Sequence, residues 1–147
     1  MERLLSAMRD HRLWDNERAA RFGALGSLHV GLFWDGLRGA ILNIAQYCDL
    51  SDIIQMLREA GATKAPAVLE ELVRHFPERK VPEDFSEIHE AITSMEESTA
   101  DIFNRFEKRF EECWREEGVE LLLHAWVAAN TDAFPVHDLA EMRAVTG

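Results

Sequence analysis

The sequence predicts an all-α fold, a single-domain multi-helix array of six to eight helices in an orthogonal or bundle-like arrangement. Apolar residues recur at steps of three and four along most of the 147-residue chain, which is the spacing of one helix face. Asp, Ser, Asn, Gly and Pro stand between these stretches, where helices begin and end. Hydrophobic residues make up 47% of the chain, so residues 1–147 can build one core without disulfides.

The first part of the chain is expected to form four helices, over residues 2–22, 17–34, 37–48 and 52–60. Asn16 is a candidate N-cap for the second of them. Asp35-Gly36 is the expected break before the strongly apolar stretch that follows. A β-strand over 28–34 is the alternative there, but no alternation of apolar and polar residues supports it.

The helix over residues 52–60 is expected to form a short helical hairpin with the helix that follows it. Ser51 or Asp49 is expected to cap its first helix, and Gly61 to follow its last residue. Thr63 is the expected N-cap of the second helix, which runs to about Phe76, where a proline ends it. Residues 78–82 then form the best candidate linker in the chain.

The second part of the chain centres on Met95–Glu120, which has the pattern of a long amphipathic helix. One face of it is apolar and carries Phe103, Phe106, Phe110 and Trp114. Ser86 is expected to cap a preceding helix from Glu87, which either ends near Ser94 or continues into the long helix. Gly118 is expected to break or kink the chain. Further helices are expected over residues 119–130 and 137–144.

Negative charge is concentrated in one quarter of the chain. The net charge is −11, but residues 1–82 carry equal numbers of acidic and basic residues. Residues 83–120 carry 13 acidic residues against four basic ones, a net of nine negative charges. Such a surface repels nucleic acid and anionic membranes and attracts basic partners. Solubility is the alternative reason for it.

The candidate partner-binding surface consists of the acidic side chains of this segment. They are Glu83, Asp84, Glu87, Glu90, Glu96, Glu97, Asp101, Glu107, Glu111, Glu112 and Glu116. Two favourable pairs at a spacing of four residues, Asp101–Arg105 and Glu111–Arg115, are expected to break up the row along the long helix. A continuous row therefore requires residues 83–97 to align beside that helix, or a second subunit to complete it.

No catalytic, nucleotide-binding or metal-binding motif occurs, so the sequence predicts a non-enzymatic protein without cofactors. Glu120 and His124 share a helix face, but no second pair completes a metal site. Cys48 and Cys113 stand alone on apolar faces and are expected to be reduced core residues. The N-terminus has no signal-peptide pattern, which favours a cytoplasmic protein of bacterial type.

Residues 22–134 resemble a small acidic, all-helical bacterial family of mostly uncharacterised proteins that includes a DNA-mimic protein. The resemblance rests on packing and capping residues, among them Gly36-Leu37, Ala40-Ile41-Leu42-Asn43, Ala60-Gly61-Ala62, Phe76-Pro77 and Leu121-Leu122. It implies a helical domain, a homodimer and, as in one characterised member, an acidic surface that resembles duplex DNA and captures a DNA-binding regulator.

Two functional hypotheses follow. In the first, the acidic surface engages a basic DNA-binding protein in place of DNA. In the second, the protein is an interaction or immunity-type module that binds through an apolar patch, and its acidity serves only solubility. The second needs exposed tryptophans as anchors, whereas the four tryptophans, at positions 14, 34, 114 and 126, are expected in the core.

Overall fold

The computed structural model describes residues 16–45 and 48–133. Six α-helices lie in these ranges: α2 (Glu17–Ile44), α3 (Leu50–Glu59), α4 (Lys64–Val73), α5 (Phe85–Ser98), α6 (Ile102–Glu117) and α7 (Val119–Ala129). Short 3-10 turns occupy Pro77–Arg79 and Thr131–Ala133. No strand occurs in the described part of the chain, so the all-α prediction is confirmed. The start of the first expected helix, Trp14 and the helix expected over 137–144 lie outside the described residues.

The break predicted at Asp35-Gly36 is confirmed, at Gly36. Helix α2 begins where expected, because the side chain of Asn16 accepts hydrogen bonds from the backbone N–H groups of Arg18 and Ala19. Its axis is interrupted at Gly36, whose φ of 68° and ψ of 178° suit only glycine. The part of α2 beyond Gly36 ends at Ile44, earlier than predicted.

Helices α3 and α4 form the predicted hairpin. Asp49, one of the two expected caps, accepts from the N–H of Ser51 and begins α3. Gly61 follows α3 at a φ of 99°, and the next residue, Ala62, donates back to the carbonyl of Leu57. Thr63 stands at the N-cap position of α4, as predicted, although its side chain makes no capping hydrogen bond.

The prediction of one long helix over Met95–Glu120 is wrong. The chain leaves the helical conformation after Ser98, and Asp101 adopts a left-handed conformation with a φ of 58° before α6 begins. Gly118, at a φ of 62°, separates α6 from α7, as predicted. Helix α5 begins earlier than expected, because Asp84 rather than Ser86 caps it by accepting from the N–H of Glu87.

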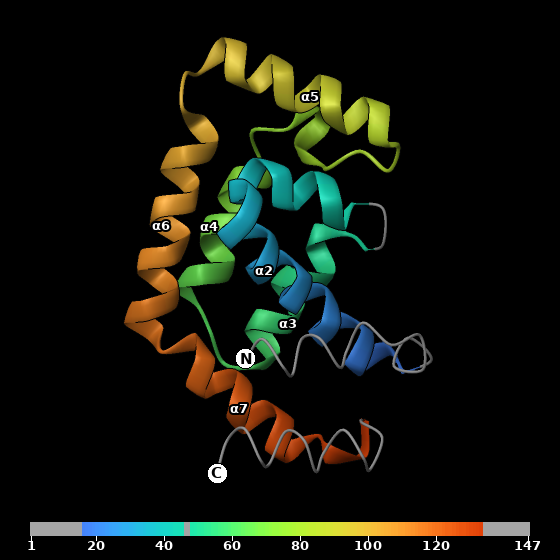
Figure 1. Cartoon of the computed structure of the whole chain (residues 1–147), viewed down its shortest axis with the longest axis vertical. Coiled ribbons are helices and arrows are strands. Elements are labelled where there is room, and N and C mark those ends of the chain that lie inside the picture. The colour runs from blue at the N-terminus through green and yellow to red at the C-terminus, as the bar shows by residue number, and fades with distance from the viewer. Residues whose placement is uncertain (1–15, 46–47, 134–147) are drawn as a thin grey trace.

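The helices form an elongated body in which α2, α3, α4 and α6 pack together and α5 crosses one end (Figure 1). Helix α6 runs along one side of this body and leads into α7 at the other end. Phe22 of α2 stacks on Trp126 of α7, with ring centroids 5.6 Å apart. Helix α6 has its most extensive contacts with α4 and α2, so its polar face is fixed relative to both.

Candidate acidic surface

Helix α6 is held by a row of aromatic side chains, as its sequence predicts. Phe103, Phe106, Phe110 and Trp114 are all buried. A row of buried rings on one face fixes the rotation of the helix about its axis, because turning it would expose them. The acidic side chains of α6 are therefore presented in defined directions.

One of these acidic residues, Glu107, makes a hydrogen bond within the chain. The backbone N–H of Leu37 donates a hydrogen bond to Oε1 of Glu107. Leu37 is the first residue after the break at Gly36, where helical N–H groups lack partners of their own. Glu107 thus caps the second half of α2, and its side chain is half-buried.

Glu117, near the end of α6, caps helix α4 in the same way. Its carboxylate accepts from the N–H groups of Thr63 at 2.7 Å, Lys64 at 2.6 Å and Ala65 at 2.8 Å, and from Oγ1 of Thr63 at 2.9 Å. Partial burial acts to raise the pKa of Glu117, but these hydrogen bonds outweigh it and hold the pKa below its usual value. The sequence analysis missed this residue, because nothing local connects it with a helix some fifty positions earlier.

Two more acidic residues of the predicted surface make ion pairs with other helices. Glu96 accepts from Nε of Arg38 at 2.8 Å, and Glu116 lies 3.2 Å from Nζ of Lys64. The two pairs expected along the chain, Asp101–Arg105 and Glu111–Arg115, are absent from the ion pairs of the structure. Arg109 also bridges between helices, with Nη2 2.6 Å from Glu71 of α4.

The acidic residues on α5 and just before it are arranged differently. Glu83, Glu87 and Glu90 are exposed and line one groove of about 610 Å³, together with Glu78 and Lys80 of the preceding turn. None of the three makes an ion pair within the described ranges. The remaining predicted residues Glu97, Asp101, Glu111 and Glu112 are exposed and likewise unpaired within these ranges.

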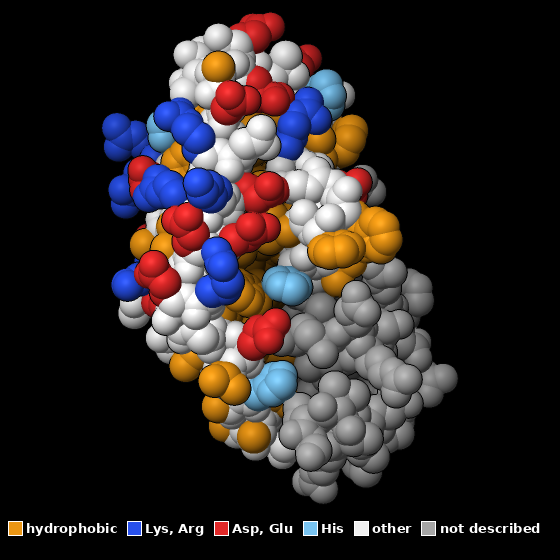
Figure 2. Space-filling model, turned by 60° about the vertical axis from the view of Figure 1, so that its left-hand side comes forward, with side chains coloured by type: hydrophobic (Ala, Val, Ile, Leu, Met, Phe, Trp, Pro, Cys, Tyr) orange, Lys and Arg blue, Asp and Glu red, His pale blue; other side chains and the backbone are white. Residues whose placement is uncertain are grey.

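The two acidic helices do not lie side by side. Helix α5 crosses the end of α6 at a sharp angle, and the chain turns between them at residues 99–101 (Figure 1). On the face shown in Figure 2, Lys and Arg side chains are interspersed among the Asp and Glu side chains. Within one chain, therefore, the residues of α5 do not extend a row along α6.

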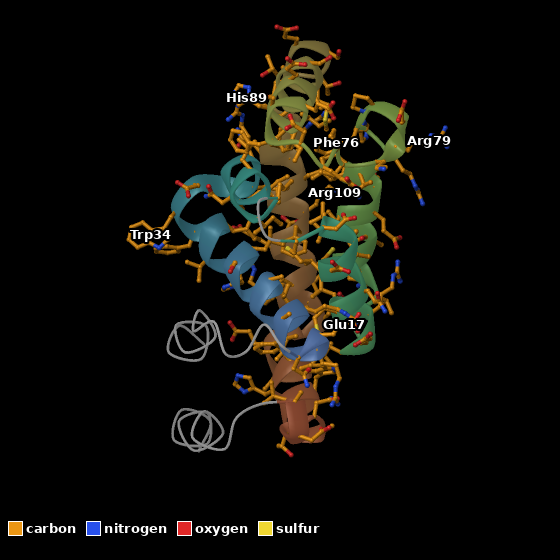
Figure 3. All side chains as sticks on the ribbon, turned by 90° about the vertical axis from the view of Figure 1, so that its right-hand side faces the viewer. Glu17, Trp34, Phe76, Arg79, His89 and Arg109 are labelled. Carbon is orange, nitrogen blue, oxygen red and sulfur yellow. The ribbon has the colours of Figure 1, made fainter. Side chains whose placement is uncertain are left out.

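Trp34 corrects the prediction that the tryptophans are buried. Its side chain is 75% exposed, and that of its neighbour Phe33 is 79% exposed. Figure 3 shows Trp34 pointing away from the helices. Trp114 and Trp126 are buried as predicted.

The side chains considered as metal ligands do not form a metal site in the described ranges. No group of three or more His, Cys, Asp or Glu side chains there could hold a metal ion, and Glu120 and His124 have no third ligand. Cys48 and Cys113 are free and half-buried rather than fully in the core. Burial raises the pKa of the Cys48 thiol to about 11, so it is a poor nucleophile.

A comparison with protein families identifies the family of the chain. Residues 16–130 match the model of the DMP19-like protein family. The chain belongs to this family. DMP19-like proteins include a DNA mimic and are not a known enzyme family, which agrees with the resemblance noted from the sequence. No curated protein and no solved structure matches the chain. Within the described residues, none of the helices of this DMP19-like protein is long and apolar enough to cross a membrane.

Proposed function

We propose that this DMP19-like protein is a non-enzymatic binding protein whose acidic surface engages a basic, DNA-binding protein in place of DNA. The observation that carries the proposal is the row of exposed carboxylates beside α5. Glu83, Glu87 and Glu90 share one groove, and no basic side chain in the described ranges pairs with them. Unpaired carboxylates keep their full charge available to a cationic partner.

Carboxylates also continue along α5 beyond this groove. Glu87, Glu90 and Glu97 lie on one side of α5 and span about 15 Å of helix axis, at 1.5 Å per residue. One strand of duplex DNA places about four phosphates along the same axial length. The three carboxylates are therefore fewer than the phosphates of one strand, and duplex DNA presents two strands.

A second copy of the chain would supply a second row. The family resemblance implies a homodimer, and we propose that two α5 rows together form the partner-binding surface. Analytical ultracentrifugation tests the dimer directly. If the protein is a monomer at all concentrations, it presents one row of carboxylates and can resemble one DNA strand at most.

The proposed function is tested by immobilising the protein and asking which DNA-binding proteins it retains at low salt. Retained proteins are expected to elute when duplex DNA is added, because DNA competes for the same basic surface. Neutralising the row with Glu83→Gln, Glu87→Gln and Glu90→Gln is expected to abolish retention. A matched variant with Glu111→Gln, Glu112→Gln and Glu120→Gln, which removes equal charge from α6 and α7, is expected to retain more. Retention that DNA does not disturb would refute the proposal.

A second function, an interaction module that uses an apolar patch, is favoured by the exposure of Phe33 and Trp34. If acidity serves only solubility, partner binding should survive both charge variants and rise with salt. Electrostatic binding should instead weaken with salt. The same retention experiment therefore separates the two functions.

A further inference from the structure

The exposed aromatic pair of α2 stands next to an exposed carboxylate, that of Asp35. Phe33 and Trp34 contact each other edge to face, with ring centroids 5.3 Å apart and an interplanar angle of 85°. Large apolar side chains so exposed are costly unless they have a role, and Trp is the residue type most enriched at the energetic centres of interfaces. The pair ends the first part of α2, just before the break at Gly36.

One carboxylate lies directly beside the pair. Asp35 follows Trp34, is exposed and makes no ion pair in the described ranges, although its Oδ2 accepts a hydrogen bond from Nδ2 of Asn43 at 3.1 Å. The two other carboxylates near the break are already engaged, because Glu107 caps Leu37 and Glu96 pairs with Arg38 at 2.8 Å. Asp35 is therefore the carboxylate next to the pair that a cationic partner could meet.

We propose that Phe33 and Trp34 form the anchor that receives an arginine side chain of the basic partner. The proposal rests on the proposed function and specifies the contact by which the partner docks. A guanidinium is planar and weakly hydrated, so it stacks on an aromatic face while its N–H groups donate to neighbouring carboxylates. An apolar partner would have to bury the carboxylate of Asp35 without compensation, which disfavours it. A lysine carries the same charge but lacks the planar face.

The structure already contains one contact of this kind. The guanidinium of Arg109 lies over the ring of Phe106, 5.1 Å from its centroid, while it is paired with Glu71. Arg109 thus combines an aromatic face with a carboxylate, the same combination that Trp34 and Asp35 offer to a partner. In Figure 3 Trp34 projects on a side where no described helix covers it.

The test measures binding of two peptides of equal length and charge, one rich in arginine and one rich in lysine. Trp34→Ala is expected to weaken binding of the arginine peptide about tenfold and to affect the lysine peptide less. Trp34→Leu, which keeps apolar area without an aromatic face, is expected to weaken it similarly. Leu121→Ala is the matched control, because Leu121 is also 75% exposed and stands on a different helix, α7. Thermal unfolding followed by circular dichroism checks that each variant is folded.

The outcomes separate the anchor from the acidic surface. Trp34→Ala binding the arginine peptide as tightly as the unchanged protein would overturn the anchor, as would full affinity in Trp34→Leu. If the Glu83→Gln, Glu87→Gln and Glu90→Gln variant still weakens peptide binding in that case, the proposed function stands and only the anchor fails. If that variant also binds normally, both proposals fail.

Discussion

Helices α5 and α6 are neighbours that are both rich in glutamate, but only α6 uses glutamates to cap other helices in the described ranges. Glu107 and Glu117 of α6 turn toward the protein and cap the second half of α2 and the start of α4. Glu83, just before α5, and Glu87 and Glu90 on α5 are exposed and form no ion pair in the described ranges. The same residue type is thus structural at two positions of α6 and available for binding at these three positions.

The largest effect on stability is expected at the break in α2. Gly36→Ala should lower the free energy of unfolding by about 3 kcal/mol, because its backbone conformation suits only glycine and the new methyl group presses on the carboxylate of Glu107. Gly118→Ala is the control: its φ is also positive, but a Cβ there meets nothing within 4 Å. Urea denaturation measures both, and equal losses would show that neither the glycine-only conformation at position 36 nor the contact with Glu107 adds to the cost.

Glu117→Ala should lower the free energy of unfolding by about 2 kcal/mol, because three N–H groups at the start of α4 lose their acceptor. Its neighbour Glu116 makes only an exposed pair with Lys64, so Glu116→Ala should cost about 0.5 kcal/mol or less. Similar losses for both variants in urea denaturation would contradict a structural role that is specific to Glu117.

The contribution of Glu117 should depend on pH. Its pKa in the folded protein lies below the ordinary value of 4.5, so the charged form is favoured by folding. The stabilisation is fully present above pH 4.5 and is lost as the pH falls through the lowered pKa. The stability difference between the unchanged protein and Glu117→Gln should therefore be larger at neutral pH than in acid, and a difference that is constant with pH would argue against a charged cap.

The sequence predicted the elements whose signals are local. Asn16, Asp49, Gly61 and Gly118 begin or end helices where expected, and the aromatic face of α6 is buried. It did not predict which groups make the capping hydrogen bonds. At Thr63, the N-cap position of α4, these bonds come from the carboxylate of Glu117 on α6, and Asp84 caps α5 two residues before the residue expected to do so.

The candidate surface was predicted in composition but not in arrangement. Ten of its eleven acidic residues are exposed, but Glu107 is half-buried and Asp84 is a cap. The turn at 99–101 places the acidic residues of α5 across the end of α6, and a helical projection of Met95–Glu120 as one helix cannot show that turn. Trp34 was expected in the core because large aromatic side chains are usually buried, but it is exposed at the end of the first part of α2.

The smallest effect on stability is expected for the row beside α5. Glu83→Gln, Glu87→Gln and Glu90→Gln together should change the free energy of unfolding by less than about 0.5 kcal/mol, because the three side chains are exposed and unpaired in the described ranges. Reduced repulsion among them acts in the stabilising direction. A large destabilisation would place these residues with the structural carboxylates of α6.

The distinction between partner-binding carboxylates at α5 and capping carboxylates on α6 is tested most directly by DNA competition on the immobilised protein. A basic DNA-binding protein retained at low salt should be released by duplex DNA, and it should not be retained by the Glu83→Gln, Glu87→Gln and Glu90→Gln variant, although that variant is as stable as the unchanged protein. Undiminished retention by this variant, or retention that duplex DNA cannot reverse, would contradict the account.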